Sequence, residues 1–128
     1  MIAKEQMLPM LVKSCPSFAG KWREHQQKYR DEENYLSYVA LGEFARHLIN
    51  LNKQNQTTEF ENVFETVENL HLDGEHYVKE AATIGLLEAL QNNLKDDAEK
   101  FVKYLKPESL KWWNGEIKFV GQTLNGKS

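Results

Sequence analysis

The chain has 128 residues, of which 41% are hydrophobic and 27% charged, and its formal net charge is -3. This length and composition are typical of one globular domain and exclude the disordered and fibrous classes. The sequence contains no signal-peptide pattern and no apolar run of roughly 18 residues, and its single Cys15 cannot form an internal disulfide. We therefore expect one cytoplasmic domain over residues 1–128, with no membrane association and a frayed tail at 125–128.

Apolar side chains at steps of three and four predict three helices in the first half of the chain. The first is short and contains Pro9, the second follows Ser17 as its N-cap, and the third is the longest pattern, over residues 35–52. Their stripes consist of Met7, Leu8, Leu11 and Val12, then of Phe18, Trp22, His25 and Tyr29, and then of Tyr35, Tyr38, Val39, Gly42, Ala45, Leu48, Ile49 and Asn52.

Four more helices are predicted in the second half. Thr58 and Glu61 have the spacing of a capping box at the start of residues 58–71, and the turn Asp73-Gly74 separates that helix from residues 75–90. The latter segment is apolar around most of its circumference, and its small residues, among them Gly85, would let a neighbouring helix approach closely. A sixth helix covers residues 96–105, and a seventh begins at Pro107 and carries the stripe Leu110, Trp113, Ile117, Val120 and Leu124. No segment alternates with period two, so we predict an all-α domain of about seven helices.

The pair of helices over residues 58–90 resembles a HEAT-type repeat. The resemblance rests on Asp73, on the run Val78-Lys79-Glu80-Ala81-Ala82 and on Leu86. Only one such unit is clear, whereas a solenoid needs about three. A compact bundle with one HEAT-like hairpin and a true HEAT or armadillo array are both left open.

Charge is distributed unevenly along the sequence. Residues 1–30 hold six basic and two acidic side chains, residues 31–99 hold four and fifteen, and residues 100–128 hold six and two. Many of the acids fall at predicted helix N-termini, where the helix dipole favours anions, and local capping is one explanation. The other is that these termini share one rim and form an acidic face for a basic protein; its candidate contact residues are Glu61, Glu65, Asp73 and Glu75.

No motif in the sequence specifies an enzyme or a metal site. The sequence has no glycine-rich loop of the phosphate-binding or dinucleotide-binding type and no nucleophile elbow. It also has no dense set of acidic residues with histidine in the chain order of a known catalytic site. Glu43 with His47, and His71 with His76, come nearest to metal-ligand spacing, but we expect caps and partly buried histidines there, with no metal and no cofactor. Cys15 is expected to be a small buried hydrophobe, because no basic helix N-terminus is placed to lower its pKa.

Trp112 and Trp113 cannot both lie on one narrow stripe. If Trp113 faces the core, Trp112 points about a hundred degrees away, together with Phe119 one heptad later. Either a broad buried face absorbs both tryptophans, or Trp112 and Phe119 form an aromatic contact patch for a partner or a second copy of the chain.

Several short motifs, taken together, resemble those of a family of small, uncharacterised bacterial proteins of unknown function. The motifs are Leu8-Pro9-Met10-Leu11, Cys15-Pro16-Ser17-Phe18, Ala45-Arg46-His47-Leu48, Val63-Phe64 to Leu70, Ala82-Thr83-Ile84-Gly85-Leu86-Leu87-Glu88, Gln91-Asn92, Pro107-Glu108-Ser109 and Trp112-Trp113. The resemblance implies a bacterial origin and an all-helical fold, and it implies no activity.

The expected function is a non-enzymatic protein-interaction domain. Its most concrete form is an immunity-type protein that neutralises a basic toxin through the acidic face. The alternative is a small-ligand or metal-binding enzyme that uses Glu43 with His47, or the group from His71 to His76, and a structural homodimer is a third reading. A pI of about 5.8 argues against nucleic acid as the partner.

Overall fold

The computed structural model describes residues 1–30 and 33–116, with the side chains of residues 33–36 and 95–96 left out. Within these ranges the elements are α1 (Lys4–Ser14), η1 (Pro16–Phe18), α2 (Ala19–Lys28), α3 (Glu33–Lys53), α4 (Phe60–Asp73), α5 (His76–Glu80), η2 (Ala81–Leu87), α6 (Glu88–Leu94), η3 (Lys95–Ala98), α7 (Glu99–Val102) and α8 (Pro107–Trp113). The segments α5, η2 and α6 are continuous, and counted as one they give seven described helices. The prediction of an all-α domain without strands is confirmed over this part of the chain.

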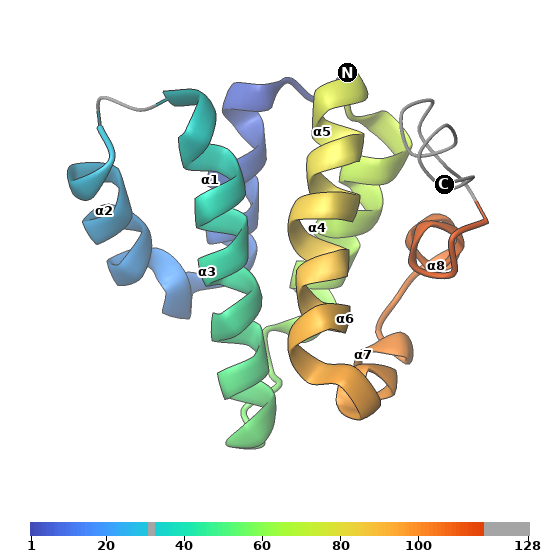
Figure 1. The fold of residues 1–128 in the computed structure, drawn as a ribbon. Helices are drawn as coiled ribbons and strands as arrows, with labels where there is room; N and C mark the ends of the chain where they lie inside the picture. The colour runs from blue at the N-terminus through green and yellow to red at the C-terminus, as the bar shows by residue number, and fades with distance from the viewer. Residues whose placement is uncertain (31–32, 117–128) are drawn as a thin grey trace.

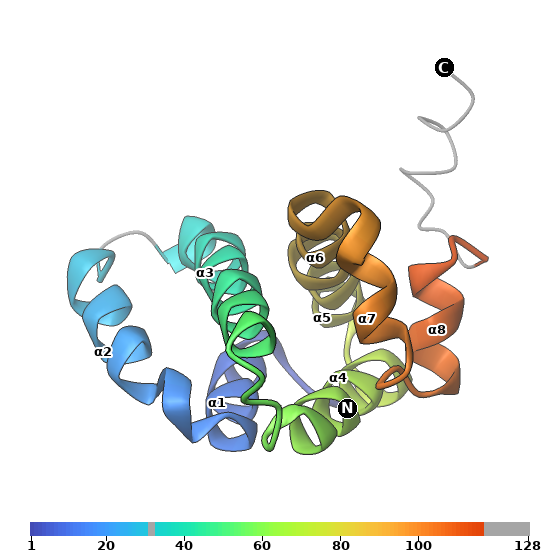
Figure 2. The ribbon, with the colours of Figure 1, turned by 90° about the horizontal axis from the view of Figure 1, so that it is seen from below.

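The helices form two layers with a helix at each edge. In Figures 1 and 2, α3 and the continuous α5–η2–α6 helix lie side by side in one layer, α1 and α4 form the other, and α2 and α8 lie at opposite edges. The apolar stripes of all these helices meet between the layers, where the largest fully buried side chains include Phe18, Phe44, Phe60, Phe64 and Phe101. No helix in the described ranges is both long and apolar enough to cross a bilayer.

A close approach at Gly85 holds α3 against the continuous helix. Gly85 lies in the π-helical segment η2, and a Cβ atom there would be 2.7 Å from Cδ1 of Leu41 on α3. A Cβ atom at this position would therefore force the buried Leu41 side chain to shift or the two helices to separate. This confirms the expected role of the small residues in this helix.

The chain reverses direction between α4 and α5 through Gly74 and Glu75. The two helices are antiparallel neighbours, as predicted (Figure 1). The backbone of Ile2 runs beside this turn: its N–H donates to the carbonyl of Asp73 at 2.7 Å, and its carbonyl accepts from the N–H of Glu75 at 2.9 Å. The N-terminal segment is thus fastened to the α4–α5 connection, while the HEAT-type repeat stays a prediction.

The seventh helix is shorter than predicted. It ends at Trp113, and Gly115 has a φ of 75°, a left-handed conformation that favours glycine. The N–H of Gly115 donates to the carbonyl of Trp112, and the N–H of Glu116 donates to that of Lys111, which is the pairing of a Schellman motif. The prediction of one helix continuing through residues 114–116 is therefore wrong. The remainder of its stripe, Ile117, Val120 and Leu124, and the predicted frayed tail lie outside the described residues.

Two predicted helix caps are also wrong. The helix α4 begins at Phe60, so Thr58 and Glu61 do not form a capping box, and its N-cap residue, Glu59, makes no capping bond with its side chain. Likewise, Ser17 lies inside η1, and the N-cap position of α2 belongs to Phe18. The side chains of Ser17 and Glu59 are used elsewhere, in contact with each other.

Candidate functional site

Four polar side chains converge where η1 meets α3 and the start of α4. Cys15 follows α1 directly, and Ser17 lies in η1; His47 comes from α3, and Glu59 precedes α4. The hydroxyl of Ser17 lies 2.8 Å from Nε2 of His47 and donates to Oε1 of Glu59 at 2.5 Å. The backbone N–H of Ser17 donates to Oε2 of Glu59 at 3.1 Å, and the Cys15 thiol donates to Oε1 at 3.3 Å. We call these four residues the Cys15 cluster.

The donors and acceptors in this cluster fix the proton on His47. The Nζ atom of Lys21 lies 3.2 Å from Nδ1 of His47, and an ammonium group can only donate. Nδ1 therefore carries the lone pair, and Nε2 carries the hydrogen and donates to Ser17. Because the Ser17 hydroxyl passes its own hydrogen to Glu59, the hydrogen bonds run in one direction from Lys21 to Glu59. His47 is assigned as the neutral Nε2–H tautomer on this basis.

The environment of the cluster keeps His47 neutral and Glu59 ionised. Burial lowers the pKa of His47, and the Lys21 ammonium lowers it further against an opposing effect of Glu59. For Glu59, burial raises the pKa, but the hydrogen bonds from Ser17 and Cys15 and the charge interaction with His47 together hold the pKa below its usual value. Burial also raises the pKa of the Cys15 thiol to about 12. In this arrangement the Cys15 thiol is protonated. The His47 nitrogen that faces Ser17, Nε2, carries a hydrogen and therefore has no lone pair to offer.

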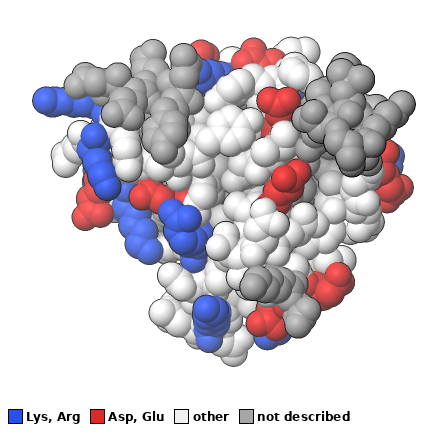
Figure 3. Space-filling view, in the orientation of Figure 1, with Lys and Arg blue, Asp and Glu red and all other residues white. Residues whose placement is uncertain are grey.

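A charged cleft of about 470 Å³ opens beside His47, between α2 and α3. Its lining residues are Lys21, Glu24, His25, Lys28, Glu43, Arg46, His47 and Asn50. We call it the α2–α3 cleft. His25 is buried and stacks on Trp22, and its Nδ1 lies 2.5 Å from Oε2 of Glu43. Figure 3 shows Lys and Arg side chains gathered at this edge of the molecule, over α2.

The predicted pair Glu43 and His47 does lie on one face of α3, because both residues line this cleft. The two side chains nevertheless have different partners, since Glu43 binds His25 and His47 binds Ser17. Across the described residues, the one cluster with metal-ligand composition and spacing is Cys15, His47 and Glu59, whose ligand atoms all lie within 4.8 Å of one another.

The structure separates the second predicted pair. His71 is buried on α4 and stacks on Trp112, whereas the side chain of His76 is 74% exposed and lies 3.9 Å from Glu80 on the next turn of its own helix. The turn at Gly74 gives them different surroundings, so His71 and His76 do not form a common site.

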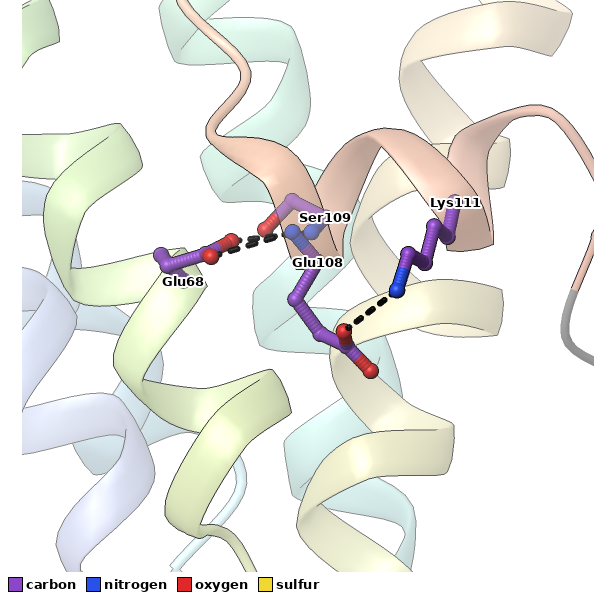
Figure 4. Close-up of polar contacts among 4 residues, drawn as sticks. All are labelled: Glu68, Glu108, Ser109 and Lys111. Carbon is purple, nitrogen blue, oxygen red and sulfur yellow. Dashed lines mark hydrogen bonds and ion pairs between the residues drawn. The ribbon is translucent and has the colours of Figure 1, made fainter.

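The helix α8 is held from two sides. On one side, the Glu68 carboxylate of α4 accepts the backbone N–H groups of Glu108 and Ser109 at 3.0 and 2.8 Å (Figure 4). On the other, η2 packs against α8, and Trp112 and Trp113 each expose only 9% of their surface. Of the two alternatives for the tryptophans, the broad buried face is the one observed. The expectation that Trp112 points away from the core is therefore wrong, and Phe119 lies outside the described residues.

The acids expected to form one face are spread over both ends of the molecule. Glu61 and Asp73 lie twelve residues apart on α4, a separation of roughly 18 Å along the helix axis. Glu61 pairs with Lys106 at 3.7 Å, and Glu75 accepts the backbone N–H of Lys4 at 3.1 Å. Glu65 lines a different groove, between α1 and α4. The shared acidic rim is thus not formed by these residues, because α4 runs opposite to α3 and α5 (Figure 1).

No pattern in the sequence predicts the Cys15 cluster. Ser17 and Glu59 are 42 residues apart, and Ser17 was predicted to be a helix N-cap. No spacing rule links them, and the one local signal was the motif Cys15-Pro16-Ser17-Phe18.

The fold and the site define a small all-helical protein with a charged cleft at one edge and a polar cluster beside it. The chain belongs to the family described as a domain of unknown function, DUF7674, whose model matches residues 8–121. This confirms the membership indicated by the short motifs. No curated protein and no solved structure matches the chain.

Proposed function

We propose that this chain is a non-enzymatic protein-interaction domain whose contact surface is the α2–α3 cleft. The observation that carries this proposal is the gathering of ionisable side chains from two helices at one open edge. Lys21, Lys28 and Arg46 are exposed there, beside Glu24 and Glu43. Fixed charges of both signs orient a partner and reject wrong ones, and they raise the association rate.

The charges of the cleft also favour one kind of partner. Three basic side chains stand against two acidic ones, and Glu43 already contacts His25. A partner with an acidic contact surface therefore fits the cleft better than the basic partner expected from the composition, for which Glu61, Glu65, Asp73 and Glu75 form no shared face. An immunity-type inhibitor remains the most concrete form of this proposal, and it would cover a toxin site lined by carboxylates. The bacterial origin and the cytoplasmic location stay predictions.

The test is a capture experiment with matched charge reversals. The tagged full chain is exposed to extract of its native host, and bound proteins are identified for the wild type, for Arg46→Glu in the cleft and for Lys103→Glu, an exposed cation remote from it. We expect one partner that the wild type and Lys103→Glu retain, that Arg46→Glu loses, and that salt releases. A partner retained by both variants would contradict the cleft as the contact surface. Elution of the free chain as a dimer that Arg46→Glu dissociates would favour the homodimer instead.

A second candidate is a small-ligand or metal-binding enzyme. The specific observation in its favour is the convergence of Cys15, His47 and Glu59 from three separate segments next to the cleft. Of the residues named for this alternative from the sequence, His47 belongs to the cluster, whereas Glu43, His71 and His76 do not.

A further inference from the structure

The Cys15 cluster contains three side chains of the types that bind transition metals. Sγ of Cys15, a ring nitrogen of His47 and a carboxylate oxygen of Glu59 lie within 4.8 Å of one another, and Sγ and Oε1 are already 3.3 Å apart. In a tetrahedral zinc site with bonds of about 2.0–2.3 Å, neighbouring ligand atoms are about 3.5 Å apart. The ligand atoms therefore need to approach one another by about 1.3 Å at most.

The hydroxyl of Ser17 holds a central position among these ligands. Its Oγ lies 2.8 Å from Nε2 of His47, 2.5 Å from Oε1 of Glu59 and 3.6 Å from Sγ of Cys15. One small polar atom thus contacts all three ligand atoms, as a bound cation would. Ser17 is exposed and sits on the three-residue helix η1, so rotation about its Cα–Cβ bond can move the hydroxyl toward solvent.

We propose that Cys15, His47 and Glu59 bind one Zn²⁺ ion, with the Ser17 hydroxyl or a water molecule as the fourth ligand. Sulfur and nitrogen ligands select zinc over magnesium and calcium, which prefer all-oxygen sites. With three protein ligands, the fourth position of the ion is left to the hydroxyl or to solvent.

Binding of the ion requires a defined movement of protons. The Cys15 thiol loses one proton to solvent and binds as the thiolate, while Glu59 binds as the carboxylate that it already is. His47 must free Nε2, so its hydrogen moves from Nε2 to Nδ1 with no net release. The complex therefore forms with release of one proton, and its affinity rises with pH.

Lys21 disfavours the binding of a zinc ion to this cluster. Its ammonium group donates to Nδ1 of His47 at 3.2 Å, and it must leave when Nδ1 becomes a donor itself. Its positive charge also repels the incoming cation. Lys21 is exposed and can swing away, so we expect it to weaken zinc binding without preventing it. Lys28 is the matched control, because it lines the same cleft from the same helix but lies over the ring of Tyr29.

The experiment titrates Zn²⁺ into the untagged full chain, with calorimetry and a competing chromophoric chelator as readouts. We expect one ion per chain, one proton released, and for Co²⁺ a thiolate charge-transfer band with intense tetrahedral visible bands. Cys15→Ser and Glu59→Gln should each weaken Zn²⁺ binding by more than about tenfold, and Cys15→Ser should abolish the charge-transfer band. Lys21→Gln should tighten binding roughly tenfold, and Lys28→Gln should leave it unchanged.

Lys21→Gln keeps the test decisive if the ligand variants fold poorly, because a gain in affinity does not arise from misfolding. Glu61→Gln, on the exposed face of α4, controls for a general loss of negative charge. The proposal is overturned if the wild type shows no stoichiometric binding at millimolar Zn²⁺, or if Lys21→Gln and Lys28→Gln behave alike. Binding that survives Cys15→Ser but is lost in Glu43→Gln would also overturn it, because the ion would then lie in the α2–α3 cleft.

Discussion

The imidazole of His71 stacks on the indole of Trp112, with ring centroids 5.8 Å apart and the two planes 17° from parallel. Both ring nitrogens of His71 also have partners: Nδ1 lies 2.9 Å from the Ser109 hydroxyl, and Nε2 lies 3.1 Å from that of Thr83. Because Thr83 donates its hydrogen to the carbonyl of Lys79, it must accept from Nε2–H of His71. A neutral His71 therefore joins α4, η2 and α8 in one buried network.

We predict that the stability of the fold falls as the pH is lowered from about 6.5 to about 4. Burial lowers the pKa of His71 from 6.5 to about 4, with Glu68 opposing the shift. In this window the unfolded chain binds a proton that the folded chain does not, so stability rises with pH and its contribution is complete above about 6.5. The shift corresponds to roughly 3 kcal/mol. Urea unfolding across this range should show a steep slope in the wild type and in His76→Gln and a clearly smaller one in His71→Gln, in which the lowered pKa of His47 still contributes.

Glu68→Ala should destabilise the protein by about 1–3 kcal/mol, because the backbone N–H groups of Glu108 and Ser109 lose their acceptor at the start of α8. Glu65→Ala is the matched control on the exposed face of the same helix, and it should change the free energy of unfolding by less than about 0.5 kcal/mol. Chemical denaturation measures both. Equal effects of the two substitutions would mean that Glu68 does not hold α8.

The helices could be predicted from the sequence because their signal is local. The stripes repeat every three to four residues, and tertiary packing then uses the same faces, as at Gly85 against α3. The end of α8 could have been predicted as well, since Asn114-Gly115 is a helix-stopping pair. The spacing of Ile117, Val120 and Leu124 beyond it favoured a longer helix.

The Cys15 cluster could not be predicted, for a different reason. A serine and a glutamate near helix starts already have local uses, so nothing in their spacing reveals that they contact each other instead. The contact between Ser17 and Glu59 spans 42 residues and depends on how η1 meets the start of α4. The tautomer of His47 depends in turn on Lys21, from yet another helix.

Replacing Gly85 and Gly20 with alanine should change the stability of the protein in opposite directions. At Gly85 the new Cβ would lie 2.7 Å from Leu41 and 3.2 Å from Tyr38, so Gly85→Ala should cost about 1–3 kcal/mol. At Gly20, inside α2, nothing lies within 4 Å of the new atom. Gly20→Ala should therefore stabilise the protein by about 0.5–1 kcal/mol. Thermal unfolding of both variants tests the close approach of α3, and a harmless Gly85→Ala would contradict it.

Glu59 and Thr58 provide a direct test of which side chain matters where α4 begins. If Thr58 capped the helix, Thr58→Ala would cost about 1 kcal/mol. In the structure the Glu59 carboxylate instead accepts three hydrogen bonds, from the hydroxyl and backbone N–H of Ser17 and from the Cys15 thiol. We therefore expect Glu59→Ala to cost about 1–3 kcal/mol and Thr58→Ala less than about 0.5 kcal/mol. Since the pKa of Glu59 is lowered, its contribution should be complete above its unfolded value of 4.5 and disappear as the pH falls further. Urea unfolding at neutral pH and below pH 4 measures both effects, and the reverse order of the two substitutions would restore the capping box.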